Sequence, residues 1–372
     1  MDRTPLDTSK LSPAIQKALG PGPAKMMAAR GMAPLPPADQ LTVLYQLSLD
    51  ADAKIADSAK QTAAGLPDSI LAGAFGNQAL DPRVLDFFGP IVAEKPAAFD
   101  AFIQSPALAD ETVAALAGKV GSREVDRIAT NEQRLLRHPQ IIGSMYLNKH
   151  ARMSTVDRVV ELAVRNNVRV PGLHAWDEIA RSLQGGSAST TQDDALFSVA
   201  ADAIESDDSL LTVGDAEKAL DYDEARDKAA LEQMKDIPIG NLSVPAKVRL
   251  ATLGNAFQRA VLVRDPVRIV AMAAIKSPGV TEFEAASYAG NQALPEDVIR
   301  HVAGKREWTK LYGTKYALCR NPKTPVTDAM RLMPFLREKD LEKLIRSKGV
   351  PSAVVAQARK LMMQRRGGSD KK

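Results

Sequence analysis

The stretch GNQALDPRVL at positions 76–85 returns as GNQALPEDVI at positions 290–299, an offset of 214 residues. Five identical residues in a row indicate an internal repeat. A polar residue followed four positions later by Pro also occurs at Asn321–Pro325 and at Ser347–Pro351. The copies that begin at 291, 321 and 347 are 30 and 26 residues apart. We therefore expect a structural repeat with a period in the twenties to thirties.

Each copy of this pattern predicts a junction between two helices. Asn or Gly tolerates the left-handed conformation that ends a helix, and Pro suits the first position of the next one. More divergent copies begin at Ser105 and Asn148, where Met153 stands in the place of Pro325. Junctions at this period are what stacked helical repeats require, because one short helix pair cannot bury its apolar face alone.

Apolar spacing predicts helices between the junctions. The clearest case is Val156, Val159, Val160, Ala163 and Val164, which follow the i, i+3, i+4, i+7, i+8 pattern of one helix face. Asn166 and Asn167 provide a stop for this helix. Alternation typical of strands is absent and Ala is abundant, so we expect an all-α protein.

The turn Asn321-Pro322-Lys323-Thr324-Pro325 resembles the Asn-x-x-Thr-Pro turn of leucine-rich-repeat-variant units, and the chain resembles HEAT-like α-solenoids more generally. The likeness covers about residues 39–183 and 237–366. It implies a helical-repeat (α-solenoid-like) architecture and says almost nothing about activity. The alternative is an irregular helical bundle whose turns merely share Asn and Pro.

Composition predicts five segments along the chain. Seven prolines fall in the first 38 residues, and a Gly/Ser/Thr cluster at 184–191 precedes an acidic stretch. The expected segments are a Pro-rich N-terminal arm (1–38), an N-terminal helical-repeat domain (39–183), an acidic flexible linker (184–236), a C-terminal helical-repeat domain (237–366) and a disordered tail (367–372).

Charge is distributed unevenly over these segments. Residues 193–236 hold fourteen acidic and four basic side chains, whereas residues 301–372 hold eighteen basic and six acidic ones. The acidic segment either shields the basic block within the chain or forms a separate docking strip, and the sequence leaves both possibilities open. A basic block makes an anionic partner reasonable.

Cysteine usage and hydropathy bear on location. The single cysteine, Cys319, allows no intramolecular disulfide, which favours a reducing compartment. The longest apolar run, 269–275, is far shorter than the roughly 20 residues of a membrane-spanning helix. The first thirteen residues lack the apolar core of a signal peptide. We expect a cytoplasmic protein with no membrane partner; the oligomeric state is not indicated.

No pattern of catalytic or metal-binding residues stands out. The four histidines form no HxxxH or HExxH pair, and Cys319 is expected to be a buried thiol on a helix. We therefore expect a non-enzymatic protein without metal or cofactor. A remaining alternative is an enzyme on a helical-repeat scaffold, by analogy with HEAT-like DNA glycosylases. It would need an aromatic residue and a carboxylate to converge on one concave face, whereas the neighbours Glu307 and Trp308 diverge on a helix.

Basic and aromatic residues interleave between Lys305 and Tyr316. In one interpretation this stretch is a groove in which cations bind phosphates and Trp308 or Tyr312 stacks on a base. The favoured interpretation places Trp308, Leu311 and Tyr312 on the buried face of one helix. The candidate residues for an anionic partner are Lys305, Arg306, Lys310, Lys315, Arg320, Lys323, Arg359 and Lys360.

The leading functional hypothesis is a scaffold or adaptor that presents a helical-repeat surface to a protein partner. Stacked helical repeats form broad binding faces, and no reaction centre is evident in the sequence. The alternative hypothesis is nucleic-acid binding through the basic C-terminal segment.

Overall fold

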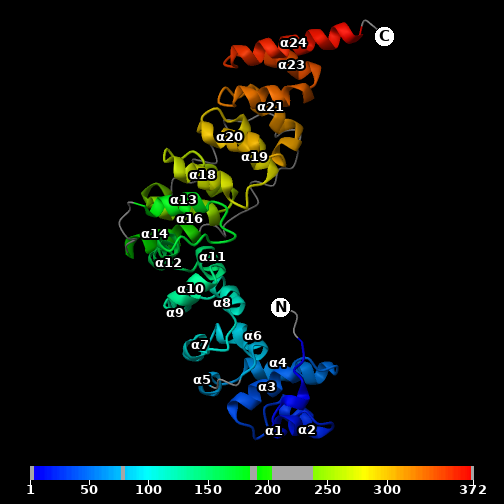
Figure 1. Cartoon of the computed structure of the whole chain (residues 1–372), viewed down its shortest axis with the longest axis vertical. Helices are drawn as coiled ribbons and strands as arrows, with labels where there is room; N and C mark the ends of the chain where they lie inside the picture. Colours follow the sequence, from blue (N-terminus) through cyan, green and yellow to red (C-terminus); the bar gives the residue numbers. More distant parts are fainter. Residues whose placement is uncertain (1–3, 77–79, 185–190, 203–237, 370–372) are drawn as a thin grey trace. The chain divides into compact units, whose positions relative to one another are not determined.

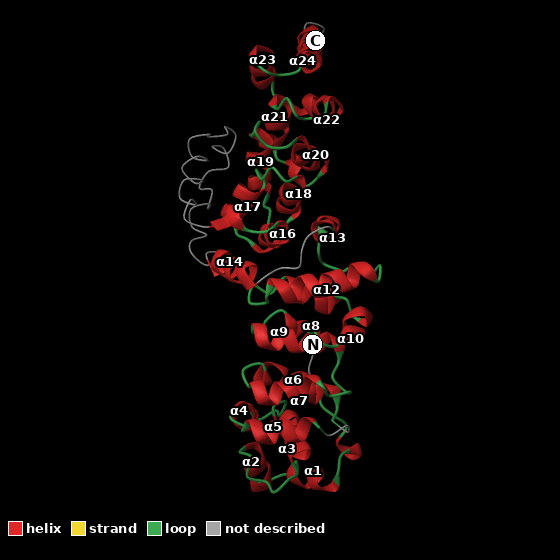
Figure 2. Cartoon of the chain, turned by 90° about the vertical axis from the view of Figure 1, so that its left-hand side faces the viewer, coloured by secondary structure: helices red, strands yellow, loops and turns green. Residues whose placement is uncertain are grey.

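The computed structural model describes residues 4–76, 80–184, 191–202 and 238–369, and every regular element in these ranges is helical (Figure 2). The predicted all-α class is confirmed. The chain forms two compact units, Met1–Gly172 and Leu173–Lys372. No helix in the described ranges is long and apolar enough to cross a membrane.

In unit 1, alternate helices pack together into two layers (Figure 1). One layer brings α3 against α5 and α5 against α7, while the other brings α2 against α4, α4 against α6 and α6 against α8. Helix α8 also packs on α11, three places along the chain. The helices are α1 (Pro13–Ala18), α2 (Pro23–Ala29), α3 (Pro37–Leu47), α4 (Ala53–Ala64), α5 (Asp68–Phe75), α6 (Pro82–Val92), α7 (Pro96–Ile103), α8 (Asp110–Ala117), α9 (Ser122–Ile128), α10 (Glu132–Arg137), α11 (Gln140–Tyr146) and α12 (Met153–Arg165). A short 3-10 helix, η1, spans Thr8–Lys10.

Unit 2 repeats this alternate packing. Helix α16 packs against α18, α19 against α21, and α22 against α24, so that the pairs α19/α20, α21/α22 and α23/α24 succeed one another (Figure 2). The helices are α13 (Trp176–Leu183), α14 (Thr191–Asp202), α16 (Val244–Leu253), α17 (Ala256–Leu262), α18 (Arg268–Lys276), α19 (Glu282–Gly290), α20 (Glu296–Gly304), α21 (Tyr312–Arg320), α22 (Val326–Leu332), α23 (Glu338–Arg346) and α24 (Ser352–Ser369). The 3-10 helices are η4 (Pro238–Asn241), η5 (Trp308–Lys310) and η6 (Met333–Phe335).

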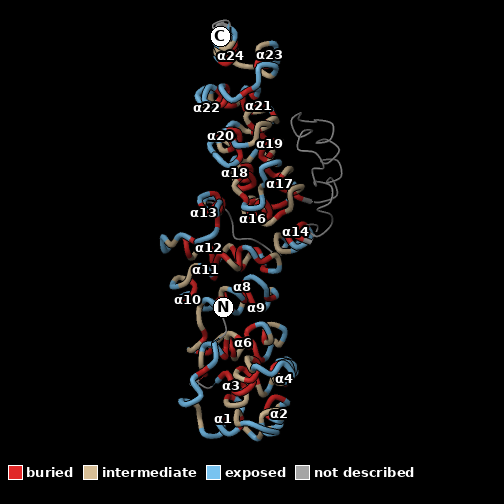
Figure 3. The backbone as a smooth tube through the Cα atoms, turned by 90° about the vertical axis from the view of Figure 1, so that its right-hand side faces the viewer, coloured by how far each residue is buried: buried red, intermediate tan, exposed pale blue. Residues whose placement is uncertain are grey.

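The apolar stripe predicted for residues 156–164 forms the buried face of α12. Val156, Val160 and Ala163 are fully covered. Asn167 has a positive φ of 55°, the left-handed conformation expected where this helix stops. Figure 3 shows buried and exposed stretches following one another along the helices. The core is therefore a series of buried helix faces between the layers.

The repeated turns are helix junctions, as predicted, but their geometry differs from the expectation. Asn321 ends α21 with an extended backbone (φ −78°, ψ 121°), not a left-handed one. Pro325 stands at the N-cap of α22, one position before the helix begins. The expectation of a left-handed Asn was wrong, because Asn321 acts at this junction through the hydrogen bonds of its side chain and not through its backbone conformation.

The Asn321 side chain joins the turn after α21 to the turn after α19 by hydrogen bonds. Its Nδ2 donates to the carbonyls of Ala289 (2.8 Å) and Asn291 (3.2 Å), and its Oδ1 accepts from the backbone N–H of Lys323 (3.0 Å). Since Asn321 is only 2% exposed, these bonds are shielded from water. The turn after α21 is thereby held in register with the turn after α19.

Asn148 makes the equivalent bonds in unit 1. Its Nδ2 donates to the carbonyls of Ala117 (2.9 Å) and Val120 (2.8 Å), on either side of the turn after α8. Its Oδ1 accepts from the N–H of His150. The two units thus use the same side chain to join turns that lie about 30 residues apart in the sequence.

The first 38 residues, expected to be an irregular arm, contain two short helices that pack on unit 1. Pro13 and Pro23 occupy the first positions of α1 and α2, where a missing N–H costs nothing. Helix α1 packs on α3, and α2 packs on α4. The prolines in this region start helices rather than prevent them.

The segment expected to be an acidic linker is only partly described. Helix α14 lies within it and packs against α16, with Phe197 and Ala200 buried. Residues 185–190 and 203–236 lie outside the described residues. Helix α13, assigned from the sequence to the N-terminal domain, packs in unit 2 against α16 and α18. Of the expected tail, 367–369 are helical and 370–372 lie outside the described residues.

Candidate interaction surface

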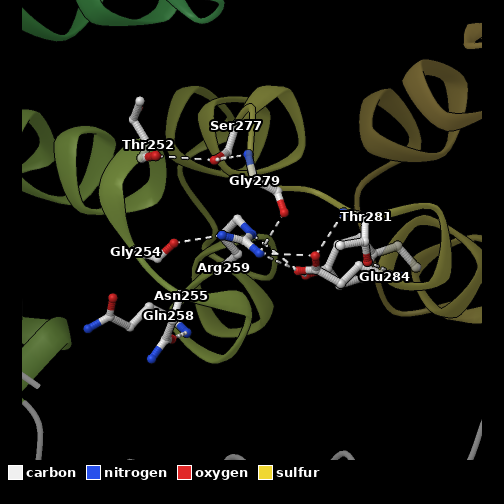
Figure 4. Close-up of polar contacts among 10 residues, drawn as sticks. Thr252, Gly254, Asn255, Gln258, Arg259, Ser277, Gly279, Thr281 and Glu284 are labelled. Carbon is white, nitrogen blue, oxygen red and sulfur yellow. Dashed lines mark hydrogen bonds and ion pairs between the residues drawn. The ribbon is translucent and has the colours of Figure 1, made fainter. Parts of the chain in front are cut away.

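A buried arginine of unit 2 joins the turn after α16 to the turn after α18. Arg259 of α17 donates from Nη1 to the carbonyl of Gly254 (2.6 Å) and from Nη2 to that of Gly279 (2.9 Å). Its Nε and Nη2 also donate to the carboxylate of Glu284 on α19 at 3.0–3.1 Å. Figure 4 shows the guanidinium between Gly254, Gly279 and Glu284. A Cβ at Gly279 would lie 2.7 Å from Nη1, so a larger residue there would displace the guanidinium from this position.

Glu284 serves a second role in the same cluster. Its carboxylate accepts from the backbone N–H of Thr281, while the Thr281 hydroxyl accepts from the N–H of Glu284, which completes a capping box at the start of α19. Arg259 and Glu284 are both nearly covered, with 8% and 13% of their side chains exposed. The pair is therefore a structural joint that positions the helices following it.

The eight basic residues singled out in the sequence occupy different positions along unit 2. Near η5 lie Lys305 and Arg306, which precede it, and Lys310, its last residue. Helix α21 carries Lys315 and Arg320, the turn before α22 carries Lys323, and α24 carries Arg359 and Lys360. None of the eight forms an ion pair with a carboxylate among the described residues. The exposed candidates are Arg306, Lys310, Arg320, Arg359 and Lys360. The structure therefore spreads the candidates over several repeats and leaves their charge uncompensated there.

Aromatic rings position three of these cations. Lys305 Nζ lies 4.1 Å from the ring centroid of Trp308, Lys315 Nζ lies 5.3 Å from that of Phe335, and the Arg320 guanidinium lies 5.4 Å from that of Tyr316. A cation on an aromatic face is held in place while its charge stays available to an anion. Lys323 is held differently, because its Nζ donates to the carbonyl of Leu294 at 2.7 Å.

Four arginines of unit 1 form ion pairs with carboxylates of other helices, unlike the eight candidates. Asp110 receives Arg137 at 2.7 Å and Arg134 at 3.2 Å, and Asp100 receives both Arg123 and Arg127 at 2.8 Å. The hydrogen bond from Arg137 holds the pKa of Asp110 below its ordinary value. These partners come from neighbouring repeats, so these cations of unit 1 are neutralised internally. The eight candidates differ in this from these four arginines and also from paired cations of unit 2 such as Arg268 and Arg366.

Trp308 lies in the core rather than in a groove, as the favoured interpretation predicted. It is 4% exposed and packs edge-on against the ring of His301 at 5.9 Å between centroids. The expected single helix is wrong, however. Trp308 belongs to η5, whereas Leu311 is an extended N-cap and Tyr312 begins α21. The single-helix face formed by Trp308, Leu311 and Tyr312 does not exist.

Cys319 is buried on α21, as predicted, with 1% of its surface exposed. Burial raises the pKa of its thiol to about 12. A reactive cysteine needs the opposite shift, which a neighbouring cation or a helix N-terminus provides. Cys319 is therefore a packing residue.

The Cys319 thiol is expected to resist labelling in the folded protein. With a pKa of about 12, roughly one thiol in 10⁴ is ionised at pH 8, against about one in ten for a model thiol of pKa 9.0. We expect labelling by a chromogenic disulfide reagent at pH 8 to be at least about a thousand times slower in native buffer than in 6 M guanidinium. Equal rates would contradict this burial, and no other cysteine can confuse the readout.

Metal-ligand clusters are absent among the described residues, where no three His, Cys, Asp or Glu side chains are arranged to hold an ion. His301 is half-buried, and burial together with Lys305 and Lys276 lowers its pKa. Lys276 pairs with the buried Glu178 at 2.8 Å. This pair connects α18 to α13 within unit 2.

The sequence analysis counted Arg337 and Arg365 in the basic block but did not single out Phe335. Phe335 is 64% exposed, Arg337 stacks on Tyr312 at 4.7 Å, and Arg365 binds the carbonyls of Pro334 and Leu336. The available signal was the apolar residue Phe335 between charged segments, but its exposure is decided by tertiary packing. Of the eight candidates predicted from the sequence, Lys315 is the one that the structure places beside the Phe335 ring.

Comparison with known proteins identifies no relative: no family model matches the chain, and neither a curated protein nor a solved structure is significantly similar to it. The proposals below therefore rest on the geometry and chemistry of the chain itself.

Proposed function

We propose that this protein is a non-enzymatic scaffold or adaptor that presents the helix faces of unit 2 to a protein partner. The observation that carries the proposal is the pair of turn-to-turn asparagines, Asn148 and Asn321. They hold successive helix pairs in register in each unit, which is the condition for a continuous repeat surface. Proteins of this architecture commonly use such surfaces for binding.

The proposed architecture is a HEAT-like α-solenoid with turns of the leucine-rich-repeat-variant kind. The alternate packing of helices in each unit supports it. So does the Asn321–Pro325 turn, whose Asn and Pro occupy equivalent junction positions at Asn291–Pro295. We place the protein in the cytoplasm on the basis of its single, buried cysteine.

Cross-linking tests the scaffold function. The full chain is incubated with an extract of cells that express it and cross-linked, and the cross-linked peptides are identified by mass spectrometry. We expect a protein whose cross-links map to helices of unit 2. Cross-links scattered over both units without a recurrent protein would contradict the proposal.

A second candidate function is nucleic-acid binding, favoured by the eight cations that lack a carboxylate partner among the described residues. Phosphate contacts make affinity fall steeply as salt rises. Fluorescent single- and double-stranded DNA, titrated with the full chain from about 50 to 300 mM salt, therefore distinguishes this function from protein binding.

Replacing four of the five exposed candidates, all except Arg320 on the Tyr316 ring, tests this second function. The quadruple variant is Arg306→Gln, Lys310→Gln, Arg359→Gln and Lys360→Gln. If these residues neutralise phosphates of a duplex, the slope of log K against log salt should become shallower by about 0.9 for each phosphate released. A control with the same charge change replaces cations that already pair with a carboxylate, namely Lys10, Lys60, Arg165 and Arg300. Equal slopes for variant and control would count against a specific DNA surface.

A further inference from the structure

Exposed apolar side chains concentrate in one short segment of unit 2. Of the nine large apolar residues exposed among the described residues, three lie within ten positions, namely Val326, Met330 and Phe335. Val326 and Met330 are one helical turn apart and share a face of α22. Phe335 is the most exposed of the three at 64%, against 37% for the other two. Exposed apolar patches mark interaction surfaces more often than isolated apolar residues do, so this segment is the candidate.

The backbone on both sides of Phe335 is fixed. Met333 is fully buried and Leu336 is 2% exposed, so the core holds both flanks. Arg365 of α24 donates from Nη2 to the carbonyl of Pro334 (2.6 Å) and from Nη1 to that of Leu336 (2.7 Å). The ring is therefore presented to solvent from a rigid segment. A side chain that needs no ordering on binding contributes more affinity than a mobile one.

One cation lies over this ring, and two more hold neighbouring groups; none of the three has a carboxylate partner among the described residues. Lys315 Nζ lies 5.3 Å from the ring centroid and is also held by the carbonyl of Lys310 at 3.2 Å. The Arg337 guanidinium rests on Tyr312, and Arg365 is bound only to carbonyls. The nearby carboxylate Asp340 is engaged by the Tyr312 hydroxyl and by Lys343, while Glu338 is exposed at the start of α23. We call Phe335, Lys315, Arg337 and Arg365 the Phe335 patch.

We propose that the Phe335 patch, with the exposed face of α22, binds an acidic protein segment that carries apolar side chains among its carboxylates. This inference rests on the proposed scaffold function and names the partner's chemistry. Carboxylates of the segment meet the three cations, and an apolar side chain covers Phe335. Aromatic residues and arginines are both enriched at protein interfaces.

A nucleic acid fits this surface less well. Binding of single strands uses successive aromatic platforms on which bases stack. Here the ammonium of Lys315 occupies a position over the Phe335 ring, and the other exposed apolar residues of the segment, Val326 and Met330, are aliphatic. Aliphatic side chains offer apolar area to a protein partner but no stacking face to a base.

The test is a selection with the full chain against a phage library of random dodecapeptides. We expect enriched peptides that combine several Asp or Glu with at least one large apolar residue. Their affinities are then measured by fluorescence anisotropy for the wild type, Phe335→Ser and Lys315→Gln. Each substitution should weaken binding by at least about tenfold. The controls are Phe283→Ser, an exposed Phe on α19, and Lys348→Gln, an exposed Lys beyond α23; both should change affinity less than about twofold.

The outcomes separate this inference from the function on which it rests. Acidic and apolar peptides that bind the wild type but lose affinity in both patch variants support it. Peptides that bind all variants equally leave the scaffold function standing and overturn the Phe335 patch. If no peptide is enriched while single-stranded dT20 binds in a manner that Phe335→Ser weakens, both the patch proposal and the protein partner are overturned in favour of nucleic acid.

Discussion

The Arg259→Ala variant is expected to lose about 3–5 kcal/mol of the free energy of unfolding of unit 2. The substitution leaves the Glu284 carboxylate without its partner in a nearly covered position and frees the carbonyls of Gly254 and Gly279. Both tryptophans of the chain, Trp176 and Trp308, belong to unit 2. Urea unfolding followed by tryptophan fluorescence therefore measures the effect in this unit.

Two further variants make the Arg259 prediction specific. Arg268→Ala removes an exposed pair with Asp297, whose side chains are 72% and 33% exposed, and should cost only about 0–1 kcal/mol. Arg259→Lys keeps the charge but lacks the planar fork that reaches two carbonyls and a carboxylate together, so its loss should be intermediate. Equal losses for Arg259→Ala and Arg268→Ala would show that Arg259 is not the joint described above.

The second large effect is expected at Asn321. Asn321→Ala removes the amide that serves the buried carbonyls of Ala289 and Asn291, and an unsatisfied buried polar group costs about 1–3 kcal/mol. We expect a loss of about 3 kcal/mol from the free energy of unfolding of unit 2, again read from tryptophan fluorescence. Asn321→Asp should lose more, because a carboxylate cannot donate to these carbonyls and repels them.

The equivalent position in unit 1 supplies a matched control. Asn148→Ala should destabilise unit 1 by a similar amount, measured by far-UV circular dichroism. Asn166→Ala removes the same kind of bond, from Nδ2 to the carbonyl of Leu162, but at an exposed helix end, and should cost less than about 0.5 kcal/mol. Equal losses of unfolding free energy for Asn148→Ala and Asn166→Ala would show that burial does not strengthen the contribution of the turn asparagines to stability.

Local patterns in the sequence predicted the class of fold because they act over a few residues. The spacing of Val156, Val159 and Val160 specifies one buried helix face, and Asn167 ends that helix in the conformation its side chain tolerates. The repeated Asn and Pro marked helix junctions correctly. The mechanism at Asn321 was missed because its partners are contributed by a turn 30 residues away, which local reasoning does not place.

Of the candidate site, the sequence predicted only that basic residues gather near the C-terminus. The basic surplus near the C-terminus is visible in the sequence, yet whether a cation stays unneutralised depends on which carboxylate the neighbouring repeat brings to it. Arg137 meets Asp110 across a repeat, whereas Lys315 meets the ring of Phe335. No spacing rule distinguishes these two outcomes.

The sequence by itself determined that the chain is helical, that its helices meet at recurring Asn and Pro turns, and that Cys319 packs rather than reacts. These properties follow from propensity, periodicity and burial of an apolar helix face. Only the tertiary structure decided that Trp308 lies outside the helix of Tyr312, that Phe335 is exposed, and that Arg259 joins two turns. Each of these depends on contacts between residues of different helices, where packing and hydrogen bonding select one arrangement among many that the local sequence allows.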